Sequence, residues 1–264
     1  MLGKLIKHEW KAVGKILGII HLALILMAIV GKIMLSIEVL NEAWLLWRML
    51  LLIYVFSVMA VGIGTHIYLA VRFYKNMYTD EGYLSFTLPV KAWEHMFSKT
   101  LVSTIWIVID GVAIIGSIVI LVMYKGMGTE AIQMMQEMVK IIGESGFVGV
   151  LGVIQTVLNV VLSLVSIPLT YYFSISVGQL FNTHKMLASV IAFFITTNVI
   201  QIIVTVCSAM ILLGNGAQAD VEAVIDGPVL YQNLLNMGTI LQLVLVVVIC
   251  LVINYIMNKR LNLE

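Results

Sequence analysis

Six long apolar stretches constrain the fold of this chain more than any other feature of its sequence. A helix needs about 20 mostly apolar residues to cross the hydrocarbon core of a bilayer, and each stretch has that length. Transmembrane strands are about ten residues long and alternate in polarity, whereas these runs of Leu, Ile and Val are continuous. We therefore predict an all-α fold, a single transmembrane domain over residues 1–264 with six transmembrane helices. They are predicted at residues 15–37, 44–71, 100–124, 147–177, 187–213 and 234–257.

The composition agrees with a chain whose solvent is mostly lipid. Hydrophobic residues make up 61% of it and charged residues 11%. Soluble domains are about 45–50% apolar and about 25% charged, so a water-soluble domain is excluded. The formal net charge of +1 provides no basic field for nucleic acid, and we expect no such partner. We expect the lipid bilayer itself to be the main partner of the surface.

Six crossings place both ends of the chain on one side of the membrane, and the basic residues indicate which side. Eleven lysines and arginines lie on the side of the termini, and four lie on the opposite side. Cytoplasmic loops carry the excess of Lys and Arg, so we predict that both termini are cytoplasmic. The eleven are Lys4, Lys7, Lys11, Lys15, Arg72, Lys75, Lys91, Lys99, Lys185, Lys259 and Arg260.

The first 14 residues have the pattern of an amphipathic helix. Leu5, Trp10 and Val13 recur at helical spacing, with lysines between them. Because this segment precedes a complete span, we predict an interfacial elbow helix over residues 1–14 that bends into the first crossing. We expect it to be retained as an anchor, since no small-residue cleavage site follows the apolar run. The alternative is a positively charged flank without a set geometry.

Segment 72–99 is the longest predicted cytoplasmic loop and the most charged. Thr79 or Asp80 can cap a short helix there, and an acidic residue such as Glu81 is favourable in its first turn. The proline that follows would end the helix. The pattern predicts a compact helix that exposes apolar side chains to a partner, namely Tyr83, Leu84 and Phe86. The alternative is an interfacial re-entry in which the aromatic rings only dip into the headgroups.

This loop carries a family resemblance. Residues 80–90 read DEGYLSFTLPV, and Ser98-Lys99 follow. With an amphipathic elbow, six spans and short outer loops, the run resembles the permease subunits of type-2 ABC exporters of Gram-positive bacteria, over nearly the whole chain. In that family the loop between the second and third spans holds a coupling helix that docks into a separate ATPase subunit. The resemblance implies this role for Asp80, Glu81, Gly82, Tyr83, Leu84 and Phe86.

The resemblance also implies partners, location and cargo. It implies cytoplasmic ABC ATPase subunits, a second permease copy or a similar permease, and the cytoplasmic membrane of a bacterium. ATP and Mg²⁺ belong to the partner ATPase, and we expect no cofactor bound by this chain. The implied cargo is an amphipathic or apolar molecule such as a peptide, an antibiotic or a lipid-like compound. The chain has no GxxxxGK[ST], HExxH or GxSxG motif, so we do not expect it to be an enzyme.

Two polar stripes interrupt the apolar spans. In the fourth span, polar residues follow each other at steps of three and four, so they share about a 100° arc of a helix. The fifth span has a similar set. The stripes predict either interhelical hydrogen bonds or a hydrated pathway or dimer seam. The candidate seam residues are Gln155, Asn159, Ser163, Ser166 and Thr170, with Thr197, Gln201 and Thr205.

Asp110 lies near the middle of the third span. A charge there would cost about 2.5–3.5 kcal/mol on an insertion scale, so we predict that Asp110 faces protein and is neutral or paired. It is either a structural acid satisfied by His21, His66 or a backbone group, or a contact for a cationic cargo. The two histidines are interpreted as core residues, and we expect no metal site because no second ligand lies at metal spacing.

Two other classes of function remain open at this point. The chain could be a channel without a motor, or a membrane scaffold whose inner loop holds a cytoplasmic partner. An intramembrane enzyme would need a nucleophile beside a base, and Asp110 with a histidine is a weak candidate pair.

Overall fold

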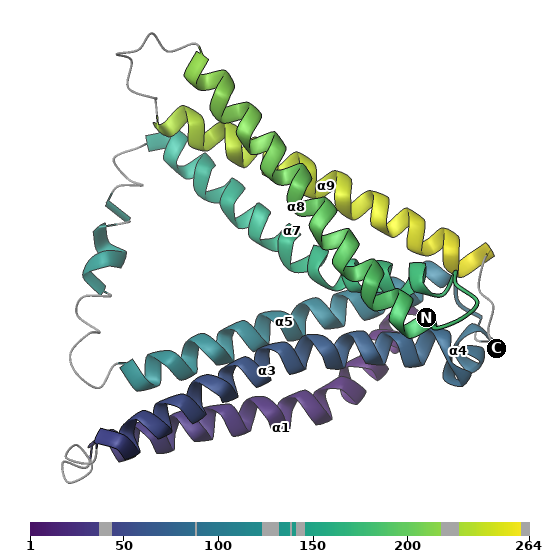
Figure 1. Ribbon diagram of the computed structural model, residues 1–264, viewed down its shortest axis with the longest axis horizontal. Helices are drawn as coiled ribbons and strands as arrows, with labels where there is room; N and C mark the ends of the chain where they lie inside the picture. Colours follow the sequence, from purple (N-terminus) through teal and green to yellow (C-terminus); the bar gives the residue numbers. More distant parts are fainter. Residues whose placement is uncertain are drawn as a thin grey trace. The chain divides into compact units, whose positions relative to one another are not determined.

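The structure, a computed structural model, contains helices joined by short connections, and no strand, in the residues that it describes (Figure 1). These are residues 1–36, 44–87, 89–122, 132–137, 139–140, 146–217 and 227–259. Among these residues, six helices are long and apolar enough to cross a membrane, so the chain is a multi-pass membrane protein and the predicted all-α class is confirmed. They are α1 (Leu2–Ser36), α3 (Trp44–Tyr78), α5 (Ala92–Val122), α7 (Gly146–Gly178), α8 (Lys185–Ala217) and α9 (Gly227–Lys259).

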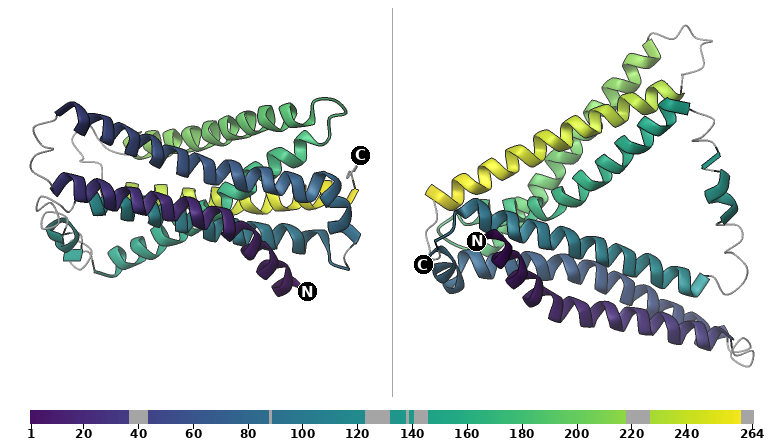
Figure 2. Two further views of the ribbon diagram at one scale, coloured as in Figure 1. Left: turned by 90° about the horizontal axis from the view of Figure 1, so that it is seen from below. Right: turned by 180° about the vertical axis from the view of Figure 1, so that it is seen from behind.

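The helices extend beyond the predicted apolar spans. The predicted elbow over residues 1–14 is continuous with the first span in α1, although Figure 2 shows its N-terminal end turned away from the rest. Segment 72–99 is mostly helical, because α3 runs on to Tyr78 and α5 begins at Ala92. Hydropathy marks only the lipid-facing part of a helix, whereas the backbone ladder continues through polar residues. The predicted span limits at residues 37 and 124 lie outside the described residues.

The chain divides into two compact units. Unit 1 comprises residues 1–72 and 97–142, and it contains α1 with most of α3 and α5. The side of α1 that packs in this unit carries Val13, Leu17, Leu24 and Ala28, which are almost completely buried. Their steps of four and seven place them on one face of the helix. The core of unit 1 is therefore an apolar helix–helix seam.

Unit 2 comprises residues 73–96 and 143–264. Within it α7 packs against both α8 and α9. The last two turns of α3 belong to this unit, where the rings of Phe73 and Tyr172 stack with centroids 3.8 Å apart. One turn further along, the hydroxyls of Tyr78 and Ser176 are hydrogen-bonded at 2.6 Å. These contacts hold the end of α3, and the short helix that follows it, to α7.

The corner between α7 and α8 is tight. A Cβ atom on Gly178, the last residue of α7, would lie 2.6 Å from both the backbone N and the Cα of Ser189 on α8. The segment between the helices ends at His184, whose φ of 54° is in the left-handed region and whose carbonyl accepts the N–H of Ala188 at 2.9 Å. Glycine at 178 is thus what lets the two helices approach closely.

Candidate functional site

The predicted short helix of the inner loop is present as α4 (Asp80–Thr87). Asp80 and Glu81 form its acidic first turn, where carboxylates are favourable near the unpaired N–H groups. The amide of Asn76, on the last turn of α3, donates a hydrogen bond to the Glu81 carboxylate. The N–H of Gly82 donates to the Thr79 carbonyl at 2.7 Å. The start of α4 is therefore fastened to the end of α3.

The exposed surface of α4 is smaller than predicted. Tyr83 and Leu84 are 66% and 69% exposed, as the pattern predicts. The prediction that Phe86 is exposed is wrong: the ring is half-buried, with its centroid 6.0 Å from that of His95. Gly82 is buried. Because α5 begins early, His95 contacts Phe86 of α4. Tyr83 and Leu84 are then the exposed apolar side chains of α4 that a partner could bind.

The start of α5 has a local cause. The Glu94 carboxylate accepts the backbone N–H of Lys91 at 2.9 Å, and the N–H of Glu94 donates to the Lys91 carbonyl at the same distance. This reciprocal pair satisfies the free N–H groups at a helix start in the manner of a capping box. It explains why α5 begins at Ala92 and not at the predicted residue 100.

A buried acid in unit 1 joins three helices. Glu9 of α1 accepts hydrogen bonds from Arg72 Nε at 2.7 Å and Nη2 at 3.2 Å, and from Lys99 Nζ at 3.1 Å. Arg72 lies on α3 and Lys99 on α5. We name this cluster the Glu9 clasp. The sequence pattern did not predict this contact among Glu9, Arg72 and Lys99.

The Glu9 clasp holds both ends of the segment that carries α4. The two parts of unit 1 are residues 1–72 and 97–142. Arg72 is the last residue of the first part, and Lys99 is near the start of the second, so both partners of Glu9 lie next to segment 73–96 in the sequence. Charge-assisted and bidentate hydrogen bonds are the strong ones. One carboxylate of α1 therefore contacts α3 and α5 close to both ends of segment 73–96. The sequence does contain a signal for the Glu9 clasp, because Glu9 lies on the apolar side of an amphipathic helix whose other charged residues are basic.

Asp110 is buried in unit 1 and paired, as predicted. Its Oδ1 atom lies 2.8 Å from Nε2 of His21 on α1 and accepts the Thr65 hydroxyl of α3 at 3.1 Å. All three residues are at most 4% exposed. His66, the other predicted candidate, is half-buried, and the hydrogen bonds described for Asp110 come from His21 and Thr65. The geometry agrees with the structural alternative for Asp110.

The histidine fixes the proton balance of this cluster. Nδ1 of His21 lies 2.6 Å from the Leu17 carbonyl, which can only accept, so Nδ1 carries a proton. Nε2 and the Asp110 carboxyl then share one proton, and the pair is neutral overall in either arrangement. A hydrolytic triad requires the hydroxyl to contact the imidazole, whereas Thr65 contacts the acid. The arrangement thus suits burial in a membrane better than nucleophilic catalysis.

We expect Asp110→Leu to lower the free energy of unfolding by about 2 kcal/mol or more, because Nε2 of His21 and the Thr65 hydroxyl lose their partner in a buried place. Asp110→Asn should cost much less, since the amide can donate to Nε2. Unfolding in mixed detergent micelles at increasing dodecyl sulfate measures both. Equal losses for the two variants would show that packing, and not hydrogen bonding, is what Asp110 contributes.

The polar stripe of α7 contacts α9 at one end. Gln155 Nε2 donates to Asn236 Oδ1 at 2.7 Å, and Asn159 Nδ2 donates to the Thr239 hydroxyl at 2.9 Å. Gln232 Nε2 donates back to Gln155 Oε1 at 2.5 Å. For these two stripe residues the geometry agrees with interhelical hydrogen bonding. The α9 partners Gln232, Asn236 and Thr239 follow at steps of four and three, so a polar stripe is visible in the sequence of this helix too.

The remaining stripe residues do not form such a ladder. Ser163, Ser166 and Thr170 each donate to a carbonyl of α7 three or four residues earlier, at 2.7–2.8 Å. On α8, Thr197 does the same at 2.9 Å, while Gln201 and Thr205 are exposed. Hydroxyls satisfied by their own helix need no polar neighbour. The polar face of α8 is left open to a partner or to lipid.

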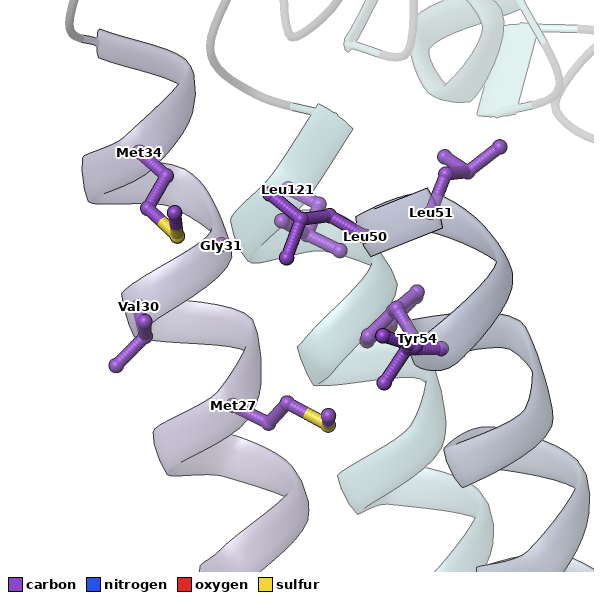
Figure 3. Close-up of a pocket in the computed structure, with 9 residues that line it drawn as sticks. Met27, Val30, Gly31, Met34, Leu50, Leu51, Tyr54 and Leu121 are labelled. Carbon is purple, nitrogen blue, oxygen red and sulfur yellow. The ribbon is translucent and has the colours of Figure 1, made fainter. Parts of the chain in front are cut away.

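Unit 1 also contains an apolar hollow of about 130 Å³ between α1, α3 and α5. Figure 3 shows Met27, Met34 and Leu121 around it, with Leu50 and Tyr54 from α3. The Tyr54 hydroxyl is already hydrogen-bonded to Ser117 at 2.7 Å. The described residues that line this hollow carry no charged group, so they offer packing space and no charged contact for a ligand.

Comparisons of the chain with protein-family models, curated proteins and solved structures found no match. The description as a multi-pass membrane protein rests on the six apolar helices themselves.

Proposed function

We propose that this chain is the permease subunit of a type-2 ABC exporter, which moves an amphipathic or apolar cargo across the cytoplasmic membrane of a bacterium. Two cytoplasmic ATPase subunits supply ATP hydrolysis, and a second permease copy or a similar permease completes the pathway. The observation that carries the proposal is α4: a short, acidic-capped helix between two spans, with Tyr83 and Leu84 exposed at its surface.

The form of α4 supports a docking role. The Asn76–Glu81 hydrogen bond fixes the start of α4 to the end of α3. A helix that only rests in the lipid headgroups does not need such a fixed orientation. An exposed aromatic residue beside an exposed leucine is typical of the anchors that fill a partner's groove. A rigid helix with two such anchors suits the transfer of motion from a motor protein.

The Glu9 clasp supports the mechanism. When the ATPase subunits close on ATP, α4 moves with them, and its flanking residues Arg72 and Lys99 transmit the displacement to α1 through Glu9. The first three spans then move as a body, and the seam between the two permeases opens alternately to the two sides. The exposed amide of Gln201 on α8 supports a second copy, because a polar side chain in hydrocarbon is costly without a partner.

The ATPase partner gives the direct test. We expect that the chain, purified from its source cells, carries ATP hydrolysis with it, and that Tyr83→Ala with Leu84→Ala removes it. When two side chains that become buried in a partner's groove are removed, binding weakens by about 2 kcal/mol or more, roughly thirty-fold. The measurement is ATP hydrolysis per purified chain, together with export by vesicles that contain the variant.

A matched variant controls for the loss of exposed apolar surface. Leu180 and Phe181, in the connection between α7 and α8, are also an exposed leucine and an exposed aromatic residue. Their double change to alanine should leave the hydrolysis in place. If both double variants keep it, α4 is not the coupling helix. If no hydrolysis accompanies the unaltered chain, the channel or scaffold alternative is favoured.

A further inference from the structure

A hollow in unit 1 lies beside the N-terminal part of α1 and combines cations with aromatic rings. His8, Lys11 and Lys15 line it, together with Trp10 of α1 and Trp106 of α5. The two indole rings are stacked, with centroids 5.2 Å apart. A Cβ atom on Gly14 would lie 3.3 Å from the Trp106 ring, so the glycine lets that ring close against α1. The residues that line the hollow include no acid.

The cations of this hollow belong to a longer stripe. Lys4, Lys7, Lys11 and Lys15 follow at steps of three and four, and all four are exposed. Glu9, the acid on this part of α1, is buried on the other side of the helix and is occupied by the Glu9 clasp. The stripe therefore keeps its positive charge, which favours an anionic ligand.

The same face of α1 becomes apolar beyond the hollow. Three exposed apolar residues follow Lys15 at steps of four, three and four, namely Ile19, Leu22 and Leu26. At about 100° per residue, the lysines and these three residues share an arc of about 120°. Along the helix, the lysines and the tryptophan pair therefore come first, with Trp10 between Lys7 and Lys11, and the hydrocarbon surface follows. A free phosphate would use only the first part of this surface.

We propose that the hollow binds the headgroup of an anionic phospholipid, whose acyl chains lie along Ile19, Leu22 and Leu26. Lysines attract anionic headgroups, and tryptophan rings favour the boundary between headgroups and chains. Lys11 and Lys15 hold the phosphate, and the Trp10–Trp106 pair forms the wall of the hollow. The site needs only membrane insertion, so it does not depend on the chain working with an ATPase.

Lipid binding to the detergent-solubilised full chain tests the site, with native mass spectrometry to count bound molecules. The probes are a short-chain phosphatidylglycerol, a phosphatidylcholine with the same chains, and glycerol phosphate, which has the anionic group without chains. We expect preferential binding of phosphatidylglycerol and no competition by glycerol phosphate. Each lysine near an anionic surface contributes about a factor of five. The Lys11→Gln, Lys15→Gln double variant should therefore bind phosphatidylglycerol about twenty-five-fold more weakly.

Two further variants separate a site from general surface charge. Lys4→Gln with Lys7→Gln removes the same charge from the same stripe outside the hollow, and it should change the affinity less than about three-fold. Lys11→Arg with Lys15→Arg keeps the charge and should keep the affinity. Equal losses for the two glutamine pairs, or undiminished binding after loss of Lys11 and Lys15, would overturn the site. Competition by glycerol phosphate would identify a soluble anion as the ligand instead.

Discussion

Glu9→Gln is expected to lower the free energy of unfolding by about 3–5 kcal/mol, the largest loss that we expect from a single change of charge. The substitution keeps the shape of the side chain but removes the negative charge between Arg72 and Lys99. The Lys99 side chain is 7% exposed and that of Arg72 is 20% exposed, so water cannot replace the lost partner well. Removing the acid from a buried ion pair is costly because the two desolvated cations lose their charge-assisted hydrogen bonds to it. Unfolding by dodecyl sulfate in mixed micelles measures it.

A double-mutant cycle separates the clasp from local packing. When Lys99→Met is added to Glu9→Gln, Arg72 can still donate to the amide oxygen at position 9, and one buried charge is gone. The double variant should then lose at least about 1 kcal/mol less than the sum of the single variants. As a control, Asp80→Asn removes one negative charge from an exposed side chain and should cost no more than about 1 kcal/mol. Strict additivity in the cycle would mean that Glu9 and Lys99 do not interact.

Gly178→Ala should destabilise the chain by about 3 kcal/mol or more, at the upper end of what overpacking costs. The added methyl group would meet the Ser189 hydroxyl as well as the Ser189 backbone, 2.6 Å from N and Cα. A side chain can rotate away, but the backbone of α8 cannot move without opening the corner between the two helices. The Ser189 hydroxyl also lies 3.4 Å from the Ile175 carbonyl of α7, so α7 and α8 are close at this corner. The yield of folded chain and its thermal stability in detergent report the change.

Gly64→Ala is the matched control for Gly178→Ala. Gly64 lies inside α3, and a Cβ atom there would have no neighbour within 4 Å. The same substitution should therefore be neutral or stabilise the helix by about 0.5–1 kcal/mol, because alanine loses less backbone freedom on folding. Equal stability of the two variants would contradict the tight packing of Gly178 against Ser189.

Local signals in the sequence located the helices but not their full lengths. The start of α5 is an example: the apolar run begins at residue 100, yet the capping pair of Lys91 and Glu94 starts the helix at Ala92. That signal lies within four residues of sequence and could have been found. The position of Phe86 could not, because its burial depends on where α5 places His95.

The sequence by itself determined the fold class, because long apolar runs must become helices wherever lipid cannot satisfy the backbone. It also determined that Asp110 must be neutral or paired, since an unpaired charge at mid-span is costly. Only the tertiary structure decided which residues are partners. Asp110 pairs with His21 and Thr65. Glu9 pairs with Arg72 and Lys99, and Gly178 packs against Ser189. Membrane insertion depends on each segment alone, whereas a pairing depends on how helices far apart in the chain are rotated against one another. That rotation is set by the summed packing of whole helix faces, which no short stretch of sequence records.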